Sequence, residues 1–213
     1  MFEGTNQMEA DQEAVAAARV EFADLLDGLS NEQLVTETLC SGWTPKEVAG
    51  HLVSFVELSL PSMMFSMAKA GFNVDKAWDR NARTYGAAPV SEITAQLRAN
   101  AAKPAPIKSF PAGVSVTDVT VHTQDVRRSL GIDAPANADR VRMALDFVTA
   151  HKKRKIMVKP ERIDGLQLVA TDLDWSWGSG PEASGTGEAV LLAIFGRSTY
   201  DELSGDGVDR LRG

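Results

Sequence analysis

The sequence predicts a mainly helical protein in which a helical bundle precedes a small α+β domain. Apolar residues recur at helical spacing up to about residue 155, and several of the predicted helix ends carry capping residues. After residue 155 the chain changes to glycine, tryptophan and loosely alternating residues. We therefore expect a helical bundle over residues 1–155 and an α+β domain over residues 156–213.

The first helix of the bundle is predicted over Glu9–Leu29, where apolar residues follow the spacing of one helix face. Ser30 and Gln33 then resemble a capping box before a short helical turn. The next start is marked by Thr44 as N-cap and by Pro45 at the first helical position. Glu47 follows three residues after the cap, which completes a capping box. This helix is expected to continue to about Leu60.

The remaining elements are predicted from periodicity and from breaker residues. The expected helices are one from near Pro61 or Val74 to Tyr85, one that Ser91 caps and that continues to about Ala102, Val114–Leu130 ending at Gly131, and Ala138–His151. Lys103–Pro111 contains three prolines and is predicted to be a loop. The last third is expected to hold a strand at Leu166–Thr171, its hairpin partner at Trp175–Gly178, and a helix at Thr186–Phe195 ending at Gly196.

The composition excludes several classes of function. The chain is 44% hydrophobic and 24% charged, with a net charge of −7. An acidic chain whose basic run, Lys152–Lys155, is short is not expected to bind nucleic acid. No segment approaches the roughly 20 apolar residues of a membrane helix, and Met1–Ala10 has no apolar signal core. Cys40 is the single cysteine, which excludes intrachain disulfides and favours a cytoplasmic protein.

One predicted helix, Val114–Leu130, carries a row of polar residues along its apolar face. The helix advances by about 100° per residue. Four polar residues therefore share one narrow stripe with apolar residues on both sides: Asp118, His122, Asp125 and Ser129. Burying two carboxylates and an imidazole without partners is costly. The stripe is therefore expected to be paired, to line a cavity or to hold a metal.

A second histidine, His51, lies among apolar residues on the helix that begins at Pro45. A single histidine on such a face is usually a hydrogen-bonded core residue. Trp43, just before the helix start, is interpreted as a packing residue, and so is Cys40.

These histidines leave two interpretations open. The polar stripe can be a satisfied hydrogen-bond network in which Asp125 pairs with Arg128 or with another helix. Alternatively, His51, Asp118 and His122 supply three ligands around an open fourth position. Such a set is typical of a catalytic divalent-metal site, most often zinc.

Several segments resemble a known family. Ser41–Leu52, with the sequence SGWTPKEVAGHL, resembles the W-x-x-x-x-[VL]-x-x-H-[LI] pattern of DinB-type helical bundles. His122–Gly131, with the sequence HTQDVRRSLG, resembles the H-x-x-D-[IV]-R-R-x-L-G pattern of the mycothiol-dependent maleylpyruvate isomerase family. The C-terminal module of that family is similar to Thr171–Trp175, Gly185–Arg197 and Leu203–Val208. The resemblance covers nearly the whole chain in the expected order.

The resemblance implies a DinB-type up-down four-helix bundle with a metal deep between its helices, followed by a small α+β domain. The family's ligands are a histidine on the second helix and a Glu-x-x-x-His pair on a later one, which correspond to His51, Asp118 and His122. Asp118 departs from the family because it is one methylene shorter than glutamate. Asp125 is expected to orient a ligating histidine ring, and Arg197 is the candidate for substrate binding or catalysis.

The resemblance also implies a low-molecular-weight thiol cosubstrate, mycothiol or a similar compound, and a small electrophilic substrate. A divalent cation can deprotonate a thiol at neutral pH, which yields a nucleophile. We therefore expect a metal-dependent isomerase or S-transferase. The alternative is a non-catalytic ligand-binding or regulatory bundle with a degenerate metal site, which the change at Asp118 leaves open.

Overall fold

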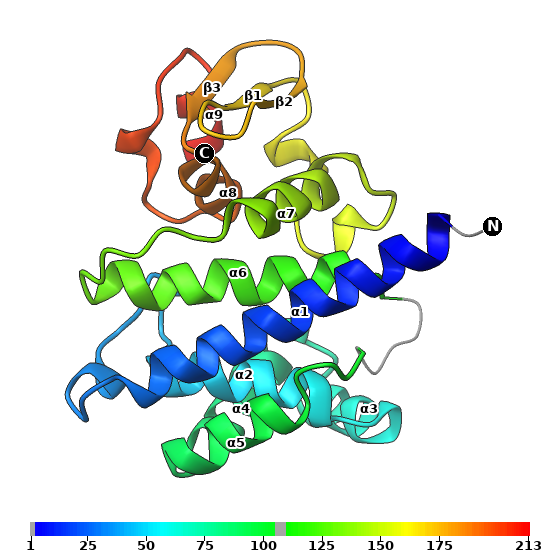
Figure 1. Ribbon diagram of the computed structural model, residues 1–213, viewed down its shortest axis with the longest axis vertical. Coiled ribbons are helices and arrows are strands. Elements are labelled where there is room, and N and C mark those ends of the chain that lie inside the picture. The colour runs from blue at the N-terminus through cyan, green and yellow to red at the C-terminus, as the bar shows by residue number, and fades with distance from the viewer. Residues whose placement is uncertain (1–2, 105–109) are drawn as a thin grey trace. The chain divides into compact units, whose positions relative to one another are not determined.

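The computed structural model describes residues 3–104 and 110–213 and confirms the predicted fold class, a mostly helical chain with a small sheet near its C-terminus (Figure 1). The helices are α1 (Glu3–Asp27), α2 (Pro45–Glu57), α3 (Leu60–Lys69), α4 (Val74–Gly86), α5 (Val90–Ala99), α6 (Ala112–Ser129), α7 (Ala138–Ala150), α8 (Gly187–Ile194) and α9 (Val208–Arg212). The strands are β1 (Gln167–Ala170), β2 (Trp175–Gly178) and β3 (Glu182–Gly185). Within the described residues, no helix combines the length and the hydropathy that a membrane span requires.

The predicted capping box at the start of α2 is confirmed. The Thr44 side chain accepts a hydrogen bond from the Glu47 amide, and the Glu47 carboxylate accepts a 2.7 Å hydrogen bond from the Thr44 amide. A similar reciprocal pair joins Ser30 and Gln33 before the short 3₁₀ turn η1 (Gln33–Val35). Such pairs satisfy amides at a helix start that have no partner within the helix.

Some helix boundaries differ from the prediction. The region expected to hold one helix after residue 60 holds two, because α3 ends in a turn where Gly71 and Phe72 both have positive φ angles and Asn73 then caps α4. The prediction that Ser91 caps α5 is wrong, since Pro89 occupies the N-cap position and Ser91 lies inside the helix. Of the loop predicted over Lys103–Pro111, residues 105–109 lie outside the described residues.

The chain divides into two units. The first comprises Met1–Ser115 and Asp125–Ile132, and the second comprises Val116–Gln124 and Asp133–Gly213. The middle turns of α6 belong to the second unit and both of its ends to the first. The predicted domain boundary at residue 155 stays a prediction.

Within the first unit, α2 and α4 lie side by side in unusually close contact (Figure 1). A Cβ atom built on Gly50 would lie 2.2 Å from the carbonyl oxygen of Ala82, and one on Gly86 would lie 2.5 Å from the carbonyl oxygen of Lys46. Cβ atoms do not approach other atoms so closely. Glycine is therefore required at both positions for α2 and α4 to approach so closely. Gly50 is the residue just before His51.

The second unit packs a three-stranded sheet against helices. The strand order is β2-β1-β3, and β1 and β2 form the predicted antiparallel pair with Ala170 opposite Trp175. The third strand, β3, was not predicted and runs parallel to β1. All residues of α8 except Glu188 are buried. The indole of Trp175 donates a 2.8 Å hydrogen bond to Asp146 in α7.

Candidate metal centre

Two helices bring the three predicted ligands together. His51 lies in the middle of α2, and Asp118 and His122 lie one turn apart on α6. Each residue offers a ligand atom, and the three atoms lie within 4.8 Å of one another. Both histidines are 7% exposed, and Asp118 is half-buried. The group is therefore largely shielded from bulk water.

The spacing and the chemistry of these side chains fit a divalent metal ion. Nε2 of His122 lies 3.6 Å from Oδ1 of Asp118, which is too long for a hydrogen bond. Two ligands held at about 2.1 Å from one tetrahedral zinc ion lie about 3.4 Å apart. Two imidazoles and one carboxylate are also a ligand set found in catalytic zinc sites, where the fourth position stays open.

A second group of possible ligands shares His122 with the first. Cys40 and Asp125 each offer an atom within 4.8 Å of the other and of a His122 nitrogen. Asp125 is completely buried, and its backbone carbonyl accepts a 3.2 Å hydrogen bond from the Leu39 amide, next to Cys40. The position of Cys40 near the histidines could not be predicted from the sequence, because a lone cysteine in an irregular segment has no periodicity that locates it.

Two tryptophans flank His51. The ring of Trp43 lies 5.1 Å from the His51 ring at an interplanar angle of 37°, and the ring of Trp78 lies 5.4 Å away and edge-on at 84°. Trp43, interpreted from the sequence as a packing residue, thus contacts a candidate ligand. Trp78 was missed, because α3 and α4 were predicted as one helix with two possible starts, near Pro61 or Val74, and its inward-facing residues were therefore not assigned.

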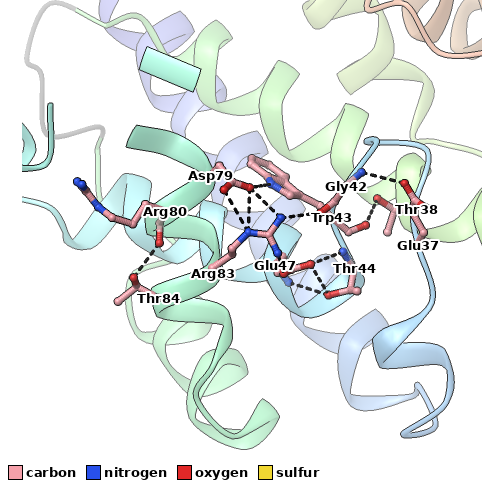
Figure 2. A network of polar contacts seen from close by, with 10 residues as sticks. All are labelled: Glu37, Thr38, Gly42, Trp43, Thr44, Glu47, Asp79, Arg80, Arg83 and Thr84. Atoms are coloured by element: carbon pink, nitrogen blue, oxygen red, sulfur yellow. Dashed lines mark hydrogen bonds and ion pairs between the residues drawn. The ribbon is translucent and has the colours of Figure 1, made fainter. Parts of the chain in front are cut away.

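A polar network holds Trp43 in place (Figure 2). The indole nitrogen of Trp43 donates a 3.1 Å hydrogen bond to Oδ1 of Asp79. Arg83 donates to both carboxylate oxygens of Asp79, to Oε1 of Glu47 at 2.6 Å and to the carbonyl of Gly42 at 3.1 Å. The hydrogen bond from Arg83 lowers the pKa of Asp79, with a smaller contribution from Trp43 that partly offsets the effect of burial. The carboxylate therefore stays ionised beside the indole.

A tight turn presents Trp43 to this network. The Trp43 amide donates a 3.0 Å hydrogen bond to the Cys40 carbonyl, and Gly42 at the third position of the turn has a φ of 82°. This conformation favours glycine. The Trp43 carbonyl accepts 2.9 Å hydrogen bonds from both the amide and the hydroxyl of Thr38. The backbone on both sides of Trp43 is therefore well anchored, since Thr44 begins the capping box.

Arg197, the candidate for substrate binding or catalysis, follows α8 in the second unit. Its guanidinium donates a 3.0 Å hydrogen bond to the carbonyl of Phe195. Neither group of possible metal ligands includes Arg197. Its role in substrate binding stays a prediction.

Comparisons with known proteins place the chain in a family. A model described as the mycothiol maleylpyruvate isomerase N-terminal domain matches residues 15–127, more than half of the chain. Two similar crystal structures are those of the mycothiol-dependent maleylpyruvate isomerase and of a histidine-to-alanine mutant of it, with TM-scores of 0.56 and 0.61. Each is 15% identical over 93% of this chain and 92% of the other, which shows a shared fold. A search of curated proteins finds no match. Because the family model covers more than half of it, the chain belongs to the mycothiol maleylpyruvate isomerase N-terminal domain family.

Proposed function

We propose that this protein is a metal-dependent enzyme that uses mycothiol, or a similar low-molecular-weight thiol, on a small electrophilic substrate. The observation that carries the proposal is the convergence of His51, Asp118 and His122 in a chain of this family. These three residues would hold a divalent ion, and zinc suits their ligand types best. The reaction is an isomerisation or a transfer of the thiol.

The residues around the ligands have distinct roles in this proposal. A bound divalent ion supplies a Lewis acid that lowers the pKa of a thiol. The buried carboxylate of Asp125 lies within 4.8 Å of a His122 nitrogen and orients that ring. Trp43 and Trp78 pack against His51 and exclude water from one side of the imidazole. Exclusion of water strengthens electrostatic interactions within the site.

The thiol chemistry is balanced in both versions of the reaction. In an isomerisation the thiolate sulfur bonds to one carbon of an activated double bond, and the electron pair moves onto the conjugated carbonyl. The remaining single bond rotates, the carbon–sulfur bond breaks, and the thiolate leaves unchanged. In a transfer the sulfur displaces a leaving group, which departs with its electron pair, and the thiol proton passes to solvent. A cosubstrate with a free thiol fits a reducing cytoplasm, which is where we propose that the protein acts.

A metal-reconstitution assay tests the proposal. The full chain is stripped with a chelator and assayed with mycothiol and a small electrophile, before and after addition of zinc. We expect turnover to vanish on stripping and to return with about one equivalent of zinc. Turnover that is unaffected by stripping would contradict metal dependence. Zinc binding without any turnover, across thiols and electrophiles, would favour the non-catalytic alternative.

A further inference from the structure

A cavity of about 220 Å³ lies in the first unit. Residues from α2, α3 and α4 line it, together with one residue after α2 and one before α6: Ser54, Phe55, Leu58, Met63, Met67, Val74, Trp78 and Phe110. A dry apolar cavity of about 150 Å³ is already large enough for a benzene molecule. The space therefore suits one aromatic ring with a small substituent.

The cavity shares a wall with the candidate metal centre. Trp78 lines the cavity, and its ring also lies 5.4 Å from the ring of His51. Phe55 follows His51 by one turn of α2, and its ring lies 5.9 Å from that of Trp78 and 6.2 Å from that of Phe110. A molecule in the cavity thus lies next to Trp78, which contacts a candidate ligand.

The lining of the cavity offers no partner to a charged group. Among the described residues, the wall contains no charged side chain, and its exposed surface is entirely apolar. The Ser54 hydroxyl donates a 2.8 Å hydrogen bond to the His51 carbonyl. A carboxylate that entered would lose its hydration without gaining a cation or a polar surface to contact. Such desolvation is strongly unfavourable.

We propose that this cavity binds an uncharged aromatic or aliphatic part of the substrate. The inference rests on the proposed function and narrows its substrate class: the electrophile is an apolar molecule whose reactive carbon lies toward His51. A small dicarboxylate does not fit this wall. Removal of apolar surface from water, rather than ion pairing, drives binding of the apolar part of the substrate.

Two matched ligands test the inference by binding alone. Toluene and 4-methylbenzoate have the same ring and differ in one carboxylate, and neither reacts with a thiol. Their dissociation constants for the full chain are measured by ligand-observed NMR. We expect toluene to bind at least about tenfold more tightly than 4-methylbenzoate, because the carboxylate is not solvated in the cavity.

Two lysine variants on α3 locate the site. Met67 lines the cavity and is half-buried. We expect Met67→Lys to weaken toluene binding by at least about tenfold and to strengthen binding of 4-methylbenzoate. Met64 lies on the same helix, is 55% exposed and is not part of the lining. Met64→Lys is therefore the matched control and is expected to change neither dissociation constant. Circular dichroism verifies that both variants are folded.

The outcomes separate this inference from the proposed function. Equal affinity for the two ligands, or an equal effect of Met64→Lys and Met67→Lys, would overturn the assignment of an apolar substrate to this cavity. Zinc binding measured on the same samples does not depend on that result. Toluene binding with no zinc binding would overturn the proposed metal-dependent function instead.

Discussion

Nε2 of His122 and Oδ1 of Asp118 lie 3.6 Å apart on successive turns of α6, the spacing of two ligands of one ion rather than of a hydrogen bond. The Asp118→Glu variant adds a methylene to a half-buried side chain and restores the glutamate of the family's Glu-x-x-x-His pair. It should therefore keep or strengthen zinc binding. The His122→Ala variant should lose most of the affinity, because a site with three protein ligands cannot easily lose one. Competition with a chromophoric chelator measures both values. Equal zinc affinities for wild type and His122→Ala would show that His122 is not a ligand.

The close contact between α2 and α4 predicts a strong effect of a single methyl group. The Gly50→Ala variant should lower the free energy of unfolding by about 1–3 kcal/mol or more, because the Cβ atom meets backbone atoms that can move only with α4. Gly28→Ala is the control, since a Cβ atom there is in ordinary contact at 3.4 Å, and it should change stability by less than about 0.5 kcal/mol. Urea denaturation compares the two. Similar stabilities for both variants would contradict the close packing of α2 and α4.

We predict different outcomes for the replacement of two arginines, Arg19, which connects α1 to the segment just after α5, and Arg98, which connects α5 to α1. Arg19 is 2% exposed and donates to the carbonyls of Asn100, Ala101 and Lys103. Its replacement by methionine should cost about 3 kcal/mol, because three carbonyls, of which that of Ala101 is buried, lose their donor. Arg98→Met should have little effect, since the ion pairs of Arg98 lie at the surface. Thermal denaturation measures both, and an equal loss would show that burial of Arg19 is not what matters.

The lowered pKa of Asp79 predicts a pH-dependent contribution to stability. The folded state favours the ionised carboxylate, so its contribution is complete above the unfolded pKa, near the ordinary 3.8. It is lost as the pH falls through the lower folded pKa. Wild type should be slightly more stable than Asp79→Asn at neutral pH, and the difference should shrink in acid. The gap is small because Asp79 is substantially exposed. Chemical denaturation at several pH values measures it, and a gap that widens in acid would contradict the assignment.

Local signals explain why α2 and His51 were predictable. The capping pair Thr44 and Glu47 sets the start of α2, and once a start is known the inward-facing positions follow from the helical repeat. His51 and His122 could be predicted to share one site because each interrupts an apolar helix face. Such an interruption can be recognised from the sequence of one helix alone. Their convergence then required only that α2 and α6 be neighbours in a bundle.

Features that depend on packing between distant segments were not predictable. Cys40 approaches His122 through a turn that is tied to α6 by the Leu39 amide, and no periodicity reports such a contact. Trp78 lies beside His51 because the glycine contact between α2 and α4 sets their separation. The strand β3, with the sequence EASG, has neither β-branched residues nor apolar alternation, and it forms by pairing with β1.

A zinc titration of the metal-free full chain tests the central claim most directly, with His51→Ala and Cys40→Ser as the compared variants. His122 belongs to both groups of possible ligands, whereas His51 belongs to one group and Cys40 to the other. We predict that wild type and Cys40→Ser each bind about one equivalent of zinc with the same affinity and that His51→Ala loses most of the affinity. Retention of zinc by His51→Ala, together with its loss in Cys40→Ser, would contradict the site proposed for His51, Asp118 and His122.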